Sequence, residues 1–442
     1  MPTRVLVVGG GGREHALAWK LAREPGVNRV VVAPGSDGIA TEPRVVVAAV
    51  PVEAEPLIGL ARAESVELVV VGPEAPLAAG LADDLRAAGI ATFGPSRAAA
   101  RIETSKAFCH EIAEAAGVPM AKARSFTDVA PAVEFADGLA LAPGSHGVVV
   151  KADGLAGGKG VTVCEPGDNL DEPIRRALAE PGGRVVVEER LEGREASLIA
   201  LCDGRDALAL PPARDHKRLL DGDEGPNTGG MGAFSPVSDL PDDEVADIVD
   251  RFHRPLLAEL ARRGSPFVGA LYAGLMLTRD GPRLLECNAR FGDPETQVLL
   301  PRLGVALGPL MLAAAHGRLA QAARPLGLTG PLLPTTRSAT AGVVLAAGDY
   351  PAGRSVGVRI DGLTAPGDAD ALVFHAGTRR AADGGWETHG GRILTVVGRG
   401  PDVEAAREAA YGAADTIRFD GVHARRDIGA AVGALAATGT AP

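Results

Sequence analysis

One segment in the second half of the chain carries polar side chains at alternating positions. Glu286, Asn288 and Arg290 are separated by Cys287 and Ala289, and alternation along a strand places the three polar side chains on one face. Two hard oxygen ligands beside a guanidinium suit Mg²⁺ held between protein and phosphates. A structural ladder of salt bridges would give the same pattern. The segment therefore predicts a magnesium site with Glu286 and Asn288 as ligands.

A glycine-rich stretch, KADGLAGGKG at 151–160, looks like a phosphate-binding loop. It fails the Walker pattern, because Gly154 lies too late and Gly160 stands where Ser or Thr is required. The stretch joins two predicted strands, so its backbone amides can lie over a triphosphate as a flap. Lys151, on the preceding strand, would direct a positive charge at the phosphates. A plain hairpin with a glycine-rich tip is the alternative.

Four consecutive glycines, 9–12, lie between the first predicted strand and helix. Exposed backbone N–H groups and the helix dipole make an anion site there. The dinucleotide fingerprint is absent, because Glu14 or His15 stands at its third glycine position, so a nicotinamide cofactor is disfavoured. A tight turn that needs small residues is the alternative. Glu74, after the fourth strand, is either a surface carboxylate or a ligand of a sugar hydroxyl.

Two more polar segments are candidates for binding. The acidic end of a buried strand, 188–191, can present backbone groups to an adenine edge, although solvated charges leaving a sheet would look the same. Asp215, Lys217 and the glycine-rich run 221–232 form a long polar loop, which includes Asn227. Loops of this length are more often functional than structural.

The elements that position these residues follow from the hydropathy pattern. In the first hundred residues, helical segments separate apolar runs at 4–8, 29–32, 45–49, 67–71 and 90–93. Continuous apolar runs of this kind belong to a parallel sheet covered on both faces. The pattern predicts a doubly wound α/β domain whose ligands gather where the strand order reverses.

The rest of the chain is expected to be mixed α/β and α+β. An insert at about 124–192 contains the flap, and a strand-rich region follows, with a helix over about 242–263. A hairpin is predicted to turn at Asp280-Gly281, and a last domain begins at about residue 331. A length of 442 residues suggests about three domains.

Composition excludes several classes of protein. The formal charge of -11 and the 3% aromatic content argue against a nucleic-acid surface. The four cysteines form no CxxC pair, which favours a reducing cytoplasm over a disulfide framework or a zinc site. The apolar stretch Leu303–Ala315 contains Pro309 and is too short to span a bilayer, so no membrane segment is expected.

Nine segments, taken in chain order, resemble the phosphoribosylamine–glycine ligase family of the ATP-grasp superfamily. The resemblance continues to Val373–Thr378. GPNTGGMG and NARFGDPETQ are specific to this family, whereas the flap and the acidic strand are shared across ATP-grasp ligases. Two positions depart from the family pattern. Cys287 stands where the family has a larger apolar residue, and Leu219-Leu220 stand before Asp221 where a smaller pair is usual. The nine segments are GGGGREHALAWKL, VVGPEAPL, FGPS, SKAF, VVKADGLAGGKG, VVEERLEGREAS, LPPARDHKRLLDGDEGPNTGGMGAFSP, LYAGLM and ECNARFGDPETQ.

The resemblance implies an ATP-grasp fold and a reaction. Its parts would be an N-terminal substrate-binding domain (1–103), a central domain (104–123 with 193–330), a lid (124–192) and a C-terminal domain (331–442). The reaction is ATP-dependent ligation of glycine to 5-phosphoribosylamine, through a glycyl phosphate, in purine biosynthesis. Such phosphoryl transfer needs positioning and charge neutralisation more than a protein nucleophile. The implied cofactor is Mg²⁺ or Mn²⁺, and a monomer that binds only small molecules is expected.

The family's site residues carry over to matching positions of this chain. Lys151, Asp215 and Arg290 would be catalytic, and Glu286 and Asn288 would bind the metal, with water and phosphate oxygens completing its shell. ATP would be bound by Lys106, Lys151, Gly154, Gly157, Gly158, Lys159, Gly160, Glu188, Glu189, Leu191 and Glu195. Phosphoribosylamine would be bound by Gly10, Gly11, Gly12, Arg13, Glu14, Glu74, Asp215, Lys217, Asn227, Arg290 and Asp293.

Three alternatives stay open from the sequence. The first is another ATP-grasp ligase or carboxylase that acts on a different amine or acid. The second is a hydride-transfer enzyme, which the failed glycine fingerprint disfavours. The third is a non-catalytic nucleotide-binding regulator, against which Lys151, Glu286 and Asn288 speak.

Overall fold

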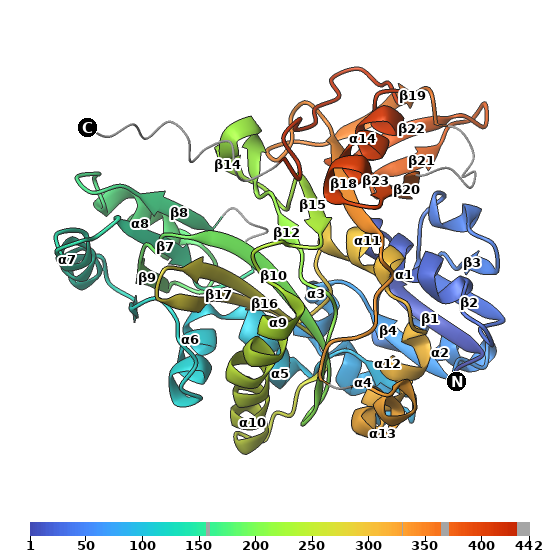
Figure 1. The fold of residues 1–442 in the computed structure, drawn as a ribbon, viewed down its shortest axis with the longest axis horizontal. Coiled ribbons are helices and arrows are strands. Elements are labelled where there is room, and N and C mark those ends of the chain that lie inside the picture. The colour runs from blue at the N-terminus through green and yellow to red at the C-terminus, as the bar shows by residue number, and fades with distance from the viewer. Residues whose placement is uncertain (156–159, 329, 364–370, 431–442) are drawn as a thin grey trace.

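A computed structural model describes residues 1–155, 160–328, 330–363 and 371–430 of the protein. Figure 1 shows the N-terminal sheet at the right and the lid at the left, with the central sheet between them. The C-terminal strands lie above the N-terminal sheet in the same view. Among the described residues, no helix is long and apolar enough to cross a membrane.

Five parallel strands form the N-terminal sheet, in the order β3-β2-β1-β4-β5. Leu6 and Val8 pack into one hydrophobic cluster, and Val5 and Val7 pack into another, because successive side chains point to opposite faces. Both faces are therefore covered, which confirms the predicted doubly wound sheet. The elements are β1 (Arg4–Gly9), α1 (Gly12–Ala22), β2 (Arg29–Pro34), β3 (Val45–Val47), α2 (Ala54–Ala63), β4 (Leu68–Val71), α3 (Glu74–Ala79), α4 (Leu81–Ala87), β5 (Thr92–Phe93) and α5 (Arg97–Thr104).

The strand order reverses between β1 and β4, which pair in parallel. The glycine turn follows β1 and Gly72 follows β4. Both turns lie at the carboxyl edge of the sheet, where ligands of such sheets gather.

Antiparallel strands form the central sheet, in the order β11-β10-β16-β17. The predicted β16–β17 hairpin is confirmed, but its turn is Arg279-Asp280, one residue earlier than expected, and Gly281 already pairs with Thr278. The predicted helix over 242–263 is interrupted by a π-helical segment, Val249–His253, because Pro255 has no N–H to donate to the preceding turn. The elements are α6 (Lys106–Ala115), β10 (Arg194–Asp203), β11 (Ala207–Ala209), α9 (Asp242–Ile248), α10 (Arg254–Arg262), β16 (Val268–Thr278) and β17 (Gly281–Asn288).

The lid has a four-stranded sheet of its own, in the order β6-β9-β7-β8. A separate hydrophobic core joins this sheet to two helices, with Val150 and Ile174 among its buried members. The lid can therefore move as one body. Its elements are β6 (Ala123–Phe126), α7 (Val129–Ala140), β7 (Val148–Ala152), β8 (Val161–Cys164), α8 (Asp171–Ala179) and β9 (Val185–Glu189).

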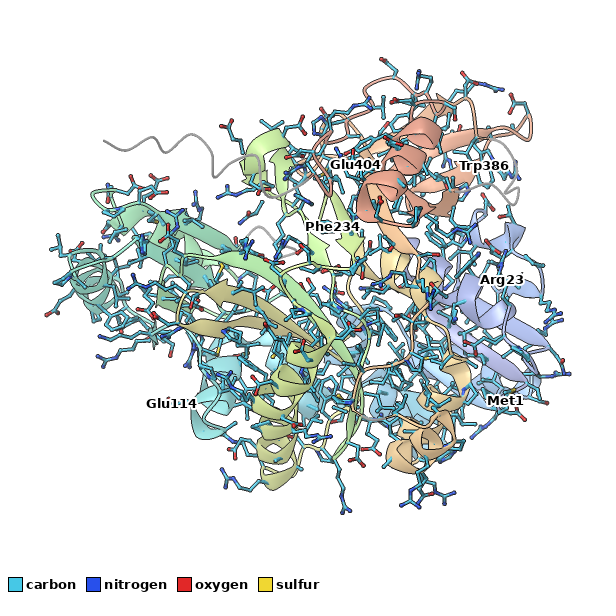
Figure 2. All side chains as sticks on the ribbon, in the orientation of Figure 1. Met1, Arg23, Glu114, Phe234, Trp386 and Glu404 are labelled. Carbon is cyan, nitrogen blue, oxygen red and sulfur yellow. The ribbon has the colours of Figure 1, made fainter. Side chains whose placement is uncertain are left out.

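The C-terminal sheet, β12-β15-β18-β23-β20, crosses the domain limit expected at residue 331. Gly232 on β15 pairs with Val343 on β18, and Figure 2 shows Phe234 of β15 at this junction. The other predicted domain limits stay predictions. The strands are β12 (Arg214–Asp215), β15 (Gly232–Ser235), β18 (Ala339–Ala346), β20 (Ala371–His375) and β23 (Arg392–Gly400).

Smaller elements surround this sheet. Three strands form a second sheet, β19-β22-β21, and two form the separate hairpin β13–β14. Their bounds are β13 (Arg218–Leu220), β14 (Glu224–Asn227), α11 (Glu295–Leu299), α12 (Leu307–Ala315), α13 (Leu319–Ala323), β19 (Ser355–Ile360), β21 (Thr378–Arg380), β22 (Trp386–Gly390) and α14 (Val403–Ala414).

Candidate active site

A cleft of about 1540 Å³ lies between the lid, the central sheet and the C-terminal strands. Most residues that the sequence singles out line it, although they come from distant parts of the chain. Gly157, Gly158 and Lys159 lie outside the described residues. The predicted residues in the cleft are Arg13, Glu74, Lys106, Lys151, Gly154, Gly160, Glu188, Glu189, Leu191, Glu195, Asp215, Lys217, Asn227, Glu286, Asn288, Arg290 and Asp293.

Lys151 and Glu188 form a buried ion pair at the lid side of the cleft. The Lys151 Nζ lies 2.8 Å from Glu188 Oε2 and donates a hydrogen bond to the carbonyl of Leu285. Burial alone would lower the pKa of Lys151, but the Glu188 carboxylate raises it above its ordinary value. The lysine therefore keeps its positive charge. The second oxygen of Glu188 lies 2.8 Å from His110 Nε2.

Lys106 lies where the flap begins. Its Nζ donates to the carbonyl of Gly154 at 3.3 Å. Asp153 accepts hydrogen bonds from the Ser105 hydroxyl and the Ala107 backbone N–H, both at 3.2 Å. The start of helix α6 thus fixes the first residues of the flap, and it brings a second lysine to the same end of the cleft as Lys151.

The predicted alternation is observed at the end of β17 and in the two residues that follow it. Cys287 and Ala289 are buried in the core, while Glu286, Asn288 and Arg290 line the cleft. Burial would raise the pKa of Glu286, but Lys217 and two other lysines lower it to about 2. The carboxylate is therefore ionised at any physiological pH.

The oxygen donors on β17 fit a magnesium ion that keeps ligands from solvent and substrate. Within the described part of the chain, no group of three or more His, Cys, Asp or Glu side chains could hold a metal ion. Mg²⁺ is usually bound by one or two protein oxygens together with phosphates and water. An ionised Glu286 beside the Asn288 amide provides that kind of donor set.

Lys217 connects the polar loop to the metal candidates. Its Nζ lies 2.8 Å from Glu195 Oε2 and 3.6 Å from Glu286 Oε1. Burial raises the pKa of the neighbouring Asp215 to about 8, and the carboxylate of Glu295 adds to the effect, whereas Lys217 opposes it. Asp215 is therefore largely protonated at neutral pH.

Sequence reasoning missed three residues beside Asp215. The Ser197 hydroxyl lies 2.9 Å from the Tyr272 hydroxyl and 3.2 Å from Glu295 Oε1. Tyr272 and Glu295 line the cleft, and Glu295 is only 3% exposed. No pattern marks Ser197 and Tyr272 as site residues, because each stands directly between two apolar residues of its strand.

Arg290 joins the central sheet to the N-terminal domain. Its Nε lies 3.1 Å from Glu74 Oε2, and its Nη2 lies 3.2 Å from Glu103 Oε1. Glu103, which the sequence reasoning did not identify, also accepts a hydrogen bond from the Ala289 backbone N–H at 2.7 Å. Arg290 and Glu74, both assigned to the substrate from the sequence, thus lie side by side in the cleft. Glu103 fixes the position of the Arg290 guanidinium.

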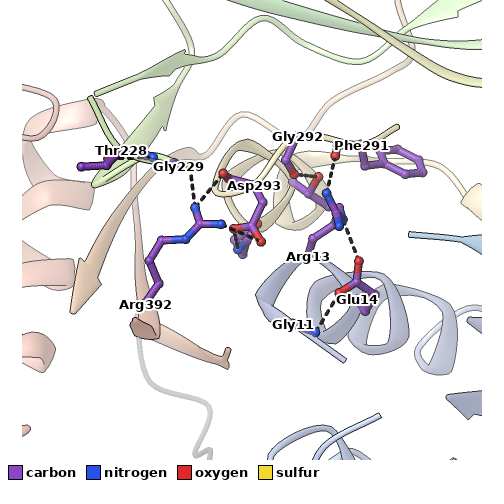
Figure 3. Close-up of polar contacts among 12 residues, drawn as sticks. Gly11, Arg13, Glu14, Thr228, Gly229, Phe291, Gly292, Asp293 and Arg392 are labelled. Carbon is purple, nitrogen blue, oxygen red and sulfur yellow. Dashed lines mark hydrogen bonds and ion pairs between the residues drawn. The ribbon is translucent and has the colours of Figure 1, made fainter. Parts of the chain in front are cut away.

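The carboxylate of Glu14 occupies the glycine turn (Figure 3). The Gly11 N–H donates to Glu14 Oε2 at 2.7 Å, and Arg13 Nε donates to Glu14 Oε1 at the same distance. A Cβ on Gly72 would overlap this carboxylate. Arg13 lines the cleft, but Gly10–Gly12 and Glu14 do not, and the Gly11 amide is already bonded. Their role in substrate binding stays a prediction.

The C-terminal domain contributes Arg392 and Tyr350, which the sequence reasoning also missed. In Figure 3 the Arg392 guanidinium reaches toward Asp293 and Gly229. Its Nη1 donates to the carbonyls of Gly229 (2.6 Å) and Asp293 (2.8 Å). The Tyr350 hydroxyl accepts from the Gly229 N–H at 2.8 Å. Both side chains line the cleft, but neither lies in a motif that would reveal it.

Known proteins share this sequence and architecture. Three family models match the chain, and their descriptions are the N, ATP-grasp (A) and C domains of phosphoribosylglycinamide synthetase, at residues 3–103, 104–296 and 340–431. The phosphoribosylamine–glycine ligase of Caulobacter vibrioides is 47% identical over 96% of this chain and 97% of its own length. The trifunctional purine biosynthetic protein adenosine-3 of Gallus gallus is 43% identical over 97% of this chain, which corresponds to 42% of that protein.

Solved structures agree with these matches. The phosphoribosylamine–glycine ligase of Thermotoga maritima superposes with a TM-score of 0.78 at 32% identity, over 96% of this chain and 99% of the other. The biotin carboxylase domain of Hydrogenobacter thermophilus 2-oxoglutarate carboxylase, in complex with MgADP and bicarbonate, gives a TM-score of 0.68 at 19% identity, over 96% and 92%. The second likeness shows the fold alone. The first, with the family models and the sequence relatives, shows that the chain belongs to the phosphoribosylglycinamide synthetase family.

Proposed function

We propose that this protein uses ATP to ligate glycine to 5-phosphoribosylamine through a glycyl phosphate. One observation carries the proposal: a single cleft joins two lysines at the flap, the oxygen donors of β17, and polar groups from the N-terminal and C-terminal domains. The family relatives named as phosphoribosylamine–glycine ligases support the same reaction.

The chemistry follows from the weakness of a carboxylate as an acyl donor. A glycine carboxylate oxygen attacks the γ-phosphorus of ATP, so that an O–P bond forms and ADP leaves. The amine nitrogen of phosphoribosylamine then attacks the glycyl carbonyl carbon, and the C–O bond to phosphate breaks as the C–N bond forms. The amine loses a proton in this second step. Charge neutralisation and alignment dominate such transfers.

The residues divide into roles along the cleft. Lys106 and Lys151 would hold the ATP phosphates, and Glu188 keeps Lys151 charged and in place. Glu286 and Asn288 would bind Mg²⁺, which would neutralise charge on the transferring phosphoryl group. Glu189, Leu191 and Glu195 are assigned to the adenine and ribose, in agreement with their place on the cleft wall.

The substrate side would be formed by Arg290 and by the groups that face it. Arg290 would stabilise negative charge on the acyl phosphate, because its guanidinium lines the cleft and is held there by Glu74 and Glu103. The minor fraction of Asp215 that is ionised at neutral pH would accept the proton that the amine loses. Lys217, Asn227 and Asp293 are assigned to phosphoribosylamine. The monomeric state, the cytoplasmic location and the use of Mn²⁺ stay predictions.

The decisive experiment measures ADP release. We expect release to require glycine and phosphoribosylamine together, with the amine formed in the assay from ribose 5-phosphate and ammonia. Formate and bicarbonate, offered in place of glycine, test other ATP-grasp reactions. ADP release with bicarbonate alone would contradict the proposal.

The intermediate has a separate test. Glycine labelled with ¹⁸O in its carboxylate should transfer one labelled oxygen to phosphate, because the oxygen that attacks ATP leaves with the phosphoryl group. Unlabelled phosphate would exclude a glycyl phosphate.

A further inference from the structure

The C-terminal segment 423–428 lies against the hairpin β13–β14, and a buried arginine is at the centre of the contact. The side chain of Arg425 is 0% exposed. Its Nη1 donates to the carbonyl of Arg218 at 3.1 Å and lies 2.7 Å from Asp223 Oδ1. Its Nε and Nη2 donate to the two carboxylate oxygens of Asp427, at 2.7 and 2.6 Å. The guanidinium thus joins two acids and a backbone carbonyl.

Neighbouring residues extend this contact along the hairpin. Asp427 Oδ2 accepts a hydrogen bond from the Gly222 N–H at 2.9 Å. The backbone N–H of Arg426 donates to Asp221 Oδ1 at 2.7 Å. His423 Nε2 lies 2.9 Å from the carbonyl of Leu219. Strand β13 and the turn that follows it, 221–223, are therefore tied to the C-terminal segment.

The hairpin needs such support because it is a two-stranded sheet. An isolated two-stranded hairpin is marginally stable in water. Leu220 is exposed, so a hydrophobic core contributes little at the tip. Without Arg425, the carboxylates of Asp223 and Asp427 would lose the guanidinium that lies between them, and the hairpin would lose one of its attachments to the C-terminal segment.

The base of the same hairpin positions the substrate side of the cleft. Arg218 pairs with Asn227, and Thr228 donates its N–H and its hydroxyl to the carbonyl of Lys217, at 2.8 and 2.9 Å. Lys217 and Asn227 line the cleft. By contrast, Lys106 and Lys151 are fixed by contacts within the lid and central sheet. A displaced hairpin would therefore move Lys217 and Asn227 while leaving the two flap lysines in place.

We propose that Arg425 and Asp427 are positioning residues for phosphoribosylamine, which act by holding the hairpin that carries Lys217 and Asn227. This inference rests on the proposed function for the identity of the substrate. The contact itself, between segment 423–428 and the hairpin, does not depend on that identity.

The test compares three variants of the full chain. Arg425→Lys keeps the charge but cannot bind four acceptors in a planar fork, and Asp427→Asn keeps the shape of the side chain but removes its charge. Arg426→Gln is the matched control, because its side chain pairs with Asp415 and its hairpin contact is made by the backbone N–H. A thermal melt of each variant confirms folding before the other measurements.

Kinetics and hydrogen exchange then give two readouts. We expect the KM for phosphoribosylamine to rise at least tenfold in Arg425→Lys and severalfold in Asp427→Asn, with the KM for ATP within twofold of the wild type. Amide exchange of Gly222 and Thr228 should accelerate at least tenfold in Arg425→Lys, without change in strand β1. The control should match the wild type in both readouts.

Two results would overturn the positioning role. One is unchanged exchange in the hairpin of a folded Arg425→Lys protein. The other is an equal rise in KM for ATP and phosphoribosylamine, which would indicate general damage. If the wild-type protein releases no ADP with glycine and phosphoribosylamine, the proposed function fails, whereas the exchange measurement still decides whether Arg425 holds the hairpin.

Discussion

Glu286 and Asn288 present their oxygen atoms to the cleft from one face of β17. We expect Glu286→Gln and Asn288→Ala to lower kcat by roughly two orders of magnitude, because each removes an oxygen that fixes Mg²⁺ against the transferring phosphoryl group. Raising the Mg²⁺ concentration should partly restore Asn288→Ala, since the carboxylate remains. Steady-state ADP release checks both variants, and normal rates at ordinary Mg²⁺ would exclude this metal site.

Asp215 should make the stability of the protein depend on pH. Its pKa is raised from 3.8 to about 8, so the folded state holds a proton that the unfolded chain releases between these values. Stability should therefore fall as pH rises from about 4 to 8, by up to about 1.4 kcal/mol per pH unit from this group. Urea unfolding of the wild type and Asp215→Asn at several pH values measures the effect. Parallel curves for the two proteins would show that Asp215 ionises normally.

At the residue scale, the sequence predicts those site residues that belong to a repeating pattern. Alternation identifies Glu286, Asn288 and Arg290, because an extended segment that buries Cys287 and Ala289 must turn the residues between and beside them to the other face. The sequence analysis assigns Glu14 to the substrate, but its carboxylate bonds the Gly11 N–H at the start of helix α1, as a Glu three residues after an N-cap commonly does. That contact depends on the precise geometry of the turn.

At the scale of elements, we expect the lid to move during the reaction. Its sheet and helices share one core, while contacts such as the hydrogen bond from Lys106 to Gly154 join it to helix α6. We expect amide exchange in β8 to slow when ATP and Mg²⁺ bind, because a closed lid excludes water from the triphosphate. Exchange in β1 provides the internal control, and glycine alone should have no effect. Equal amide exchange in β8 with and without ATP would contradict closure of the lid on the nucleotide.

Sequence patterns predict the strands of this protein better than they predict which strands pair with each other. Apolar runs predict the parallel strands well, since strands such as Leu68–Val71 are buried on both faces. One of the two strands that pair with β15 is β18, more than a hundred residues later, and nothing in the four residues of β15 specifies this partner. Arg392 and Tyr350 reach the cleft through that pairing, which explains why the sequence does not mark them as site residues.

At the scale of the whole molecule, His375 joins the C-terminal domain to the N-terminal domain. Its backbone N–H donates to His15 Nδ1 at 2.9 Å, and its ring lies 4.5 Å from that of Trp386. Burial, with smaller effects of His15 and Arg380, lowers the pKa of His375 from 6.5 to about 3. Between about pH 3 and pH 6.5, His375 is therefore neutral in the folded protein but protonated in the unfolded chain.

This interface should weaken in acid. The contribution of His375 is complete above pH 6.5 and decreases by up to about 1.4 kcal/mol per pH unit as the pH falls toward 3. His375→Phe keeps an aromatic ring beside Trp386 and removes the titration, so its stability should vary less with pH over this range. Thermal melts from pH 7 to pH 4 measure the difference. An unchanged acid dependence would assign it to other groups.

The pairing of β15 with β18 also limits how the polypeptide can be divided. A fragment that ends at residue 330 would retain β15, whose four residues are buried in the intact protein, and β12 on one side of it, but it would lose β18 on the other side. The unpaired N–H and C=O groups would then be available to strands of other molecules, which is a common origin of aggregation. Two fragments that meet at residue 330 should therefore fold better together than apart, and a split reporter based on this protein should be cut elsewhere.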